Sequence, residues 1–216
     1  NRLRRRRQAK RGQQPLRLNL AQNFGTRWTT SVSASVIRSL TRRGLSNNDN
    51  TYLSPFYNFG YTPAILPIFR RNADGTFPEN PFVASNPLQT ATLMKNDENV
   101  WRYIASGVLQ FQAVQSRNHS LRFRATGGAD YFTQENSLFF PPALQFEPDD
   151  GEPGTALLSN GLNLNYNLSP DMVYAYTPDG GAFSATTSLG MMYSFRDLRI
   201  SRIVSRNITG GLDIVA

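Results

Sequence analysis

Aromatic and amide side chains gather in one long stretch of this chain, from about Thr41 to Asn99. Exposed aromatic rings can stack on the apolar C–H faces of sugars, while neighbouring amides and carboxylates hydrogen-bond to hydroxyl groups or peptide amides. The residues that could bind an oligosaccharide or a peptide in this way are Asn47, Asp49, Tyr52, Phe56, Tyr57, Phe59 and Tyr61. The alternative is that these rings only pack the stretch against its neighbours.

A second set of candidate ligands is acidic and belongs to a loop expected from about Thr133 to Gly161. Its carboxylates are those of Glu147, Asp149, Asp150 and Glu152. Ca²⁺ takes about six to eight oxygen ligands, so such a cluster could hold the ion, but the spacing does not match an EF-hand. We favour a solvated acidic loop, and we expect neither a metal nor a cofactor.

Side chains suited to catalysis are few. The only histidine, His119, lies in an expected tight turn, and the chain has no cysteine. The serines lack the Gly-x-Ser-x-Gly context of a nucleophile, and no pair of carboxylates stands out for glycoside hydrolysis. The sequence therefore indicates a protein that is not an enzyme.

The long stretches are separated by segments in which apolar and polar residues alternate. In the first, the apolar positions are Leu16, Leu18, Leu20 and Phe24, followed by a turn at Gly25–Arg27 and by Trp28, Thr30, Val32, Ala34 and Val36. Successive side chains of a strand point to opposite faces, so this pattern predicts a hairpin with one apolar and one small, polar face.

The same pattern occurs twice more. The second hairpin is expected from Trp101 to Tyr131 with a turn at Ser116–His119, and the third from about Asn163 to Phe195 with a turn at Pro178–Gly181. The return strand of the third hairpin is expected to begin at Phe183. A membrane-spanning strand needs about 9–11 residues, and five of the six segments supply that length. The segment from Asn163 is the weakest, because Pro170 interrupts it.

Lipid on one side and a hydrated lumen on the other satisfy such two-faced strands. We therefore predict an all-β fold, a segment of an antiparallel up-and-down transmembrane β-barrel with about six strands, three hairpins and long extracellular loops. No run approaches the roughly 20 apolar residues of a membrane helix. Two alternatives stay open, a passive porin-type barrel and a soluble β-sandwich that acts as a carbohydrate-binding or adhesive module, although sandwich strands average only about 5–6 residues.

The formal net charge of +8 does not indicate a nucleic-acid partner, because most of it is local. Seven basic residues lie in residues 1–12, and without them the remainder is near +1. We interpret residues 1–14 as a basic extracellular loop tail facing anionic lipopolysaccharide, and residues 15–216 as part of one barrel domain.

Aromatic side chains favour the headgroup level of a membrane, and barrels of this type keep short turns on the periplasmic side. At the inner interface we expect Trp28, Phe111 and Phe183. At the outer interface we expect Trp101, Tyr103, Tyr131 and Tyr193. The chain has no initiator Met or signal peptide, and six strands form only an arc with open edges, so we expect a piece of a larger barrel.

Several short motifs follow one another in a distinctive order. They are Leu16-Arg17-Leu18-Asn19-Leu20, Phe24-Gly25, Trp28, Arg43-Gly44, Asn47-Asn48-Asp49, Asp74-Gly75, Asn86-Pro87-Leu88, Val100-Trp101-Arg102, Gly127-Gly128-Ala129-Asp130-Tyr131 and Arg196-Asp197-Leu198. Over roughly residues 15–210, their order and spacing resemble the barrel of SusC/RagA-like TonB-dependent outer-membrane transporters. The plug domain of that family is not visible in this chain.

This resemblance implies energy-coupled import across the outer membrane of a Gram-negative bacterial cell. Barrels of this class have about 22 strands and a plugged lumen. In the family, a SusD-like lipoprotein covers the barrel, the TonB complex acts on the plug, and the substrate is an oligosaccharide or a peptide. The present chain would supply barrel wall and outer loops.

Overall fold

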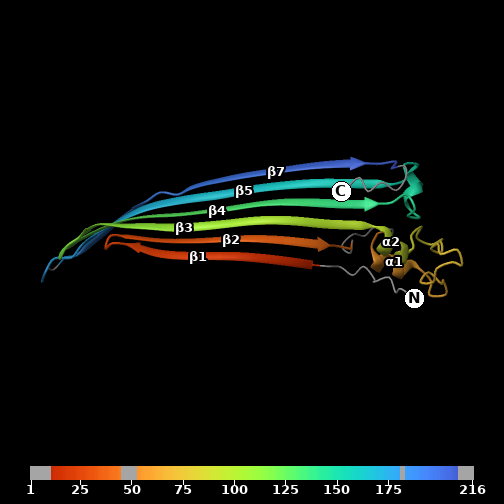
Figure 1. Cartoon of the computed structure of the whole chain (residues 1–216), viewed down its shortest axis with the longest axis horizontal. Helices are drawn as coiled ribbons and strands as arrows, with labels where there is room; N and C mark the ends of the chain where they lie inside the picture. Colours follow the sequence, from red (N-terminus) through yellow and green to blue (C-terminus); the bar gives the residue numbers. More distant parts are fainter. Residues whose placement is uncertain (1–10, 45–52, 181–182, 209–216) are drawn as a thin grey trace.

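A computed structural model of the chain describes residues 11–44, 53–180 and 183–208. The fold is all-β, with one antiparallel up-and-down sheet in which β1 to β5 pair in sequence order and β6 and β7 both pair with β5 (Figure 1). The strands are β1 (Arg11–Phe24), β2 (Trp28–Arg42), β3 (Lys95–Gln115), β4 (His119–Phe140), β5 (Thr155–Tyr176), β6 (Ala185–Gly190) and β7 (Tyr193–Ser205). None of the described helices is long and apolar enough to cross a membrane.

The loops divide the sheet into two different ends. At the short-turn end, residues 25–27, 116–118 and 177–184 connect the strands. At the long-loop end, residues 43–94 contain α1 (Pro55–Tyr61) and α2 (Pro87–Leu93), and residues 141–154 contain the 3-10 helix η1 (Glu147–Asp150). Figure 1 shows both α-helices beyond that end of the sheet.

The first predicted hairpin is confirmed. β1 and β2 meet in a tight turn in which Gly25 has a φ of 62°, a left-handed conformation that glycine adopts without a Cβ clash. The register places Leu20 opposite Val32 and Asn19 opposite Ser33. Apolar residues therefore face apolar residues, and polar residues face polar residues. β1 begins at Arg11, so residues 11–14 of the predicted basic tail belong to a strand.

The second predicted hairpin is also confirmed, but its strands are longer than predicted. β3 has 21 residues and β4 has 22, because both continue toward the long-loop end past Asn99 and Thr133. The predicted boundaries of the long loops were therefore wrong by several residues. Strands of this length far exceed the roughly 5–6 residues that are usual in a β-sandwich.

The prediction that Pro170 interrupts its segment was wrong. β5 runs through Pro170 for 22 residues, and the interruption falls on the neighbouring strand instead. Met191 N–H donates to the Pro170 carbonyl at 3.0 Å, but Pro170 has no N–H to donate in return. The predicted return strand is consequently divided at residues 191–192 into β6 and β7, and Phe183 precedes β6 rather than belonging to it.

Most fully buried side chains belong to the loops and to the strand ends beside them. The buried apolar side chains of the core are those of Ile68, Val83, Phe139, Leu144, Ala156 and Ile208. On the sheet itself, large apolar side chains are open, with Leu18 67% and Leu189 68% exposed. The sheet therefore has no core of its own within the described residues.

Two glycines of the second long loop allow a matched test of packing at the long-loop end. A Cβ on Gly154, whose φ is 90°, would lie 2.8 Å from Pro142 Cγ and 3.0 Å from Ile208 Cβ, whereas Gly151, with a φ of 76°, has nothing within 4 Å. We expect Gly154→Ala to lower the free energy of unfolding by about 3 kcal/mol and Gly151→Ala by about 1 kcal/mol. Urea denaturation would measure both, and equal losses would contradict the packing described for Gly154.

Candidate functional site

Exposed aromatic rings surround α1. The helix begins at Pro55, a residue favoured in the first turn, and it turns Asn58 inward while Phe56 stays 73% and Tyr61 61% exposed. We define the aromatic loop surface as Phe56, Tyr57, Phe59, Tyr61 and Phe69. Tyr57 stacks on Tyr61 with ring centroids 6.4 Å apart, and Phe59 on Phe69 at 5.6 Å. The structure thus brings together four of the seven predicted ligand residues, while Asn47, Asp49 and Tyr52 lie outside the described residues.

Buried amides hold α1 in place beneath these rings. Asn58 Nδ2 donates to the Ser85 carbonyl at 2.9 Å. Asn80 Nδ2 donates to the same carbonyl at 3.0 Å and to Thr62 Oγ1 at 2.7 Å. Both asparagine side chains are almost fully buried. Because buried polar groups are costly unless they are hydrogen-bonded, this network fixes the helix orientation and keeps the aromatic rings in solvent.

Asn86 is the most connected of the buried amides. Its Oδ1 accepts hydrogen bonds from the N–H groups of Leu88 and Gln89, at 2.9 and 3.1 Å, and so caps the N-terminus of α2. Its Nδ2 donates to the carbonyls of Ile68 and Pro78, both at 3.0 Å. One side chain thereby joins three separate parts of the first long loop.

Two glutamines connect the first long loop to the second. Gln89 Nε2 donates to the Ala143 carbonyl at 2.7 Å, and Gln89 Oε1 accepts from the Gln145 N–H at 3.1 Å. Gln145 Nε2 returns a bond to the Pro78 carbonyl at 2.9 Å. The two loops therefore form one joined unit at the long-loop end of the sheet.

The acidic cluster is not a uniformly solvated loop as expected. Glu147 is only 7% exposed, and its Oε2 accepts from the Gly154 N–H at 2.9 Å and from Thr155 Oγ1 at 3.0 Å. The side chains of Asp149 and Asp150 lie outside the described residues. Among the side chains that the structure does place, no group of three or more histidines and carboxylates could hold a metal ion.

Two other charged or titratable side chains have local roles. The side-chain and backbone hydrogen bonds from Thr76 lower the pKa of Asp74, which stabilises an exposed turn. His119 is the first residue of β4 rather than a turn residue, and its Nδ1 lies 2.8 Å from the Tyr174 hydroxyl. Neither arrangement resembles a catalytic site.

The two sheet faces differ as the sequence predicts. We call apolar face the side that carries Leu20 and Val32, and polar face the side that carries Asn19 and Ser33. On the polar face, Ser33 Oγ donates to Asn19 Oδ1 at 2.8 Å. Residues at the same register continue this row across the sheet, and they are Ser106, Gly128, Asn167 and Ser194.

Two groups of aromatic rings lie on the apolar face. The turn-end aromatic group consists of Phe24, Trp28, Phe111 and Phe123, and in it Trp28 stacks on Phe111 at 4.3 Å. The outer aromatic group consists of Trp101, Tyr103, Tyr131, Tyr166, Tyr193 and Phe195. Its rings form a nearly continuous series, with centroid separations of 5.0–6.3 Å within β3 and β4 and within β5 and β7.

The predicted interface residues are not all at equal register. Trp28 and Phe111 lie together near the short turns, and Tyr103 pairs with Tyr131 farther out. Tyr193, by contrast, lies level with Gly107 of β3, midway between Tyr103 and Phe111. Phe183 is 68% exposed beside the third turn.

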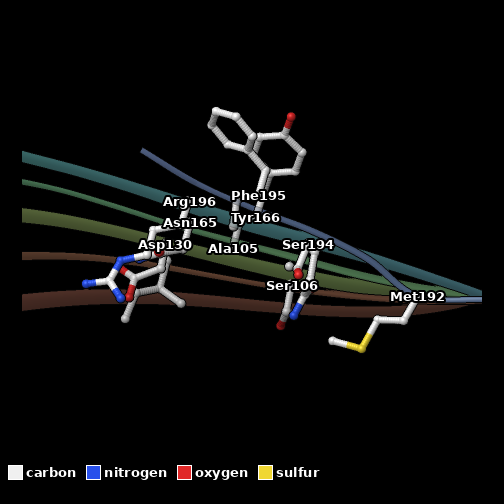
Figure 2. A pocket seen from close by; sticks show the side chains of 13 residues that line it. Ala105, Ser106, Asp130, Asn165, Tyr166, Met192, Ser194, Phe195 and Arg196 are labelled. Atoms are coloured by element: carbon white, nitrogen blue, oxygen red, sulfur yellow. The ribbon is translucent and has the colours of Figure 1, made fainter. Parts of the chain in front are cut away.

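A shallow hollow of about 480 Å³ opens where β3, β4, β5 and β7 run side by side. Figure 2 shows Tyr166 and Phe195 on one side of the sheet and Ser106 and Arg196 on the other. On the polar side of the hollow, Asp130 accepts a hydrogen bond from Arg102 Nε at 2.9 Å. The polar face thus offers charged, amide and hydroxyl groups together.

Sequence reasoning missed the buried asparagines that order the long loops. Asn80 and Asn86 are each followed by proline, and Asn86-Pro87 is a helix-start signal, since asparagine caps well and proline suits the first turn. That signal could have predicted α2. The burial of Asn58 could not have been predicted, because nothing local distinguishes it. No family model matches the chain, and no curated protein is similar to it in sequence.

Proposed function

We propose that this chain forms part of the wall and outer loops of an outer-membrane β-barrel transporter. The observation that carries the proposal is the apolar face between the two aromatic groups. It exposes Leu18, Leu20 and Val32 and, among the described residues, carries no charged side chain. In water such a surface would drive association, whereas lipid is its natural solvent.

Charged side chains begin where a membrane interface would end. Arg38 is level with Trp101, the member of the outer aromatic group nearest the long loops, and lies over its ring with its Cζ 5.0 Å from the centroid. Asp197 follows Phe195 on the same face, and Arg199 pairs with it at 2.8 Å. A basic side chain beside an interfacial ring matches the headgroup region of a bilayer.

The separation of the two aromatic groups along β3 fits a bilayer. From Trp101 to Phe111 the β3 backbone advances by ten residues, about 33 Å at roughly 3.3 Å per residue. If the strand tilts by about 40°, as barrel strands do, this length projects to about 25 Å along the membrane normal. That value matches the apolar band of outer-membrane barrels.

The outer aromatic group changes register across the strands, whereas the four members of the turn-end aromatic group lie at one register. By register, the members of the outer aromatic group shift four residues toward the short turns from Tyr103 of β3 to Tyr193 of β7. Neighbouring strands lie about 4.8 Å apart, so a tilt near 40° shifts a membrane-parallel belt by about 4 Å, or slightly over one residue, per strand. A tilt of this size would bring Tyr193 to the depth of Tyr103, while Phe195 of the same strand is shifted by two residues.

The two sheet edges indicate how the wall continues. β1 and the β6/β7 pair each have one side without a strand partner among the described residues. A lipid-exposed edge would leave backbone groups without hydrogen bonds, which bilayers do not tolerate. We therefore assign both edges to pairing with further strands of the same barrel.

Active import is the transport mode that the resemblance favours. A SusC/RagA-like assembly would use a plug, the TonB complex and a SusD-like lipoprotein to take up oligosaccharides or peptides. The aromatic loop surface lies at the long-loop end, which faces outward in such barrels, so it is available to a lid protein or to substrate. A soluble β-sandwich is less well supported, since it would need a second sheet over the apolar face.

The test uses the bacterium that encodes the protein. An epitope inserted at the exposed Asp74–Gly75 turn should be reached by antibody on intact cells, whereas one at Pro178–Gly180 should require permeabilised cells. Uptake of labelled oligosaccharides or peptides should be lost on deletion of this gene and equally on deletion of TonB. Uptake that survives TonB deletion would support the passive porin, and absence from the outer membrane would contradict the proposal.

A further inference from the structure

We propose that the polar face binds an acidic oligosaccharide, one bearing carboxylate or sulfate groups. This inference rests on the proposed function, because it takes the polar face to line the transport path. The observation behind it is the charge on that face, where, among the described residues, every carboxylate is paired but several arginines are not.

Every carboxylate that the structure places on the polar face of the strands is already paired. Asp130 bonds to Arg102, and Asp171 to Arg124 at 2.8 Å. Glu98, at the outer end of β3, pairs with Arg43 at 3.1 Å. These three acidic groups are therefore neutralised locally.

Four arginines of the same face have no acidic partner in the described part of the chain, and they are Arg17, Arg122, Arg196 and Arg202. Arg17, Arg196 and Arg202 are exposed, and the buried Arg122 Nε has no hydrogen-bond partner. Guanidinium groups stay charged at any physiological pH. The polar face consequently carries an unbalanced positive charge directed away from the lipid.

Two of these arginines lie at one level. By register, Arg17 of β1 and Arg196 of β7 are both level with Ile104 of β3. Arg196 lines the hollow together with Asn165. Within the next row along β5, Asn163 Oδ1 is buried and has no hydrogen-bond partner among the described residues. One unsatisfied acceptor thus lies one row away from the unpaired guanidinium group of Arg196.

The combination of groups favours a charged sugar. Guanidinium binds carboxylate or sulfate with two parallel hydrogen bonds, and amides and hydroxyls suit the repeated hydroxyl groups of a glycan. The row from Asn19 and Ser33 to Asn167 and Ser194 supplies such groups across the full width of the sheet. A neutral sugar would leave the arginines unmatched, and an acidic peptide would leave much of this row unused.

The experiment measures binding to the complete transporter in lipid nanodiscs by calorimetry. The probes are tetragalacturonate, its fully methyl-esterified form and tetraglutamate, so that charge and scaffold vary separately. We expect tetragalacturonate to bind at least about tenfold more tightly than either other probe, and more weakly as salt is raised. Equal binding of the neutral ester, or tighter binding of tetraglutamate, would overturn the inference.

Arginine variants test whether the polar face is where tetragalacturonate binds. Arg17→Gln combined with Arg196→Gln should weaken tetragalacturonate binding by about tenfold or more, since each charged hydrogen-bonded contact contributes on that scale. Arg27→Gln removes the same charge at a short turn and should leave binding unchanged. Equal weakening by the control would also overturn the inference. Failure of the wild-type protein to enter the bilayer would contradict the proposed function, whereas entry without acid preference contradicts this inference alone.

Discussion

Arginine at Val32 should destabilise the folded protein in a bilayer by about 2–4 kcal/mol, whereas arginine at the adjacent Ser33 should change stability by less than about 0.5 kcal/mol. Val32 lies on the apolar face, level with Gly107 and midway between the two aromatic groups. Its replacement would place a charge near the bilayer centre. Ser33 lies on the polar face, where a guanidinium remains hydrated.

Arginine at Ser33 is a stringent control for arginine at Val32, because the two positions are consecutive in one strand and lie at one depth. Folding free energies would be measured by urea titration in lipid vesicles, with Ala125→Arg as a second apolar-face variant on β4. Similar losses at Val32 and Ser33 would contradict the assignment of the apolar face to lipid. A larger loss at Ser33 would reverse the assignment of faces.

Asn86→Ala should destabilise the joined loop unit by about 3 kcal/mol or more. In a site that is fully buried, the substitution leaves two helix N–H groups and the Ile68 carbonyl without their side-chain partner. The Pro78 carbonyl loses one of its two donors and keeps the bond from Gln145 Nε2. Lost capping alone amounts to about 1 kcal/mol, and each buried unsatisfied group adds roughly 1–3 kcal/mol before relaxation. Asn86→Asp keeps the cap but places a buried carboxylate oxygen against the two carbonyls, so at neutral pH it should destabilise the unit at least as much as Asn86→Ala.

Hydrogen exchange resolved by residue would measure this loss within residues 53–94. Asn72→Ala is the matched control, because Asn72 Nδ2 bonds only to Thr76 Oγ1 at an exposed turn. We expect faster exchange across α1 and α2 in Asn86→Ala and no change in the strands. Unchanged exchange at α2 would show that the amide network does not order the loops.

Alternation was a reliable guide to the hairpins, because the period of two directly reflects which face a side chain occupies. It located the turns at Gly25–Arg27 and beyond Gln115. It failed at the outer strand ends, where both faces are polar and alternation disappears. At Pro170, local propensity was misleading, since the proline disturbs the neighbouring strand rather than its own.

The loops were harder to interpret from sequence. Composition identified the exposed aromatic residues around α1, but the order of that region depends on contacts between residues far apart, such as Gln89 with Ala143. The sequence around Glu147 likewise indicates a solvated acid. In the folded loop, however, the Gly154 N–H donates a hydrogen bond to the Glu147 carboxylate. Contacts at such separation leave no local signal.

Contact of the apolar face with lipid can be measured directly, because the chain has no cysteine. Single cysteines placed successively at positions 28–42 of β2, in the protein reconstituted in vesicles, would be reacted with a water-soluble, membrane-impermeant thiol reagent. We expect the reactivity to alternate with a period of two from Trp28 to Val36, with protection on the apolar face, and to become uniform beyond Arg38. Uniform reactivity along the whole strand would contradict contact with lipid.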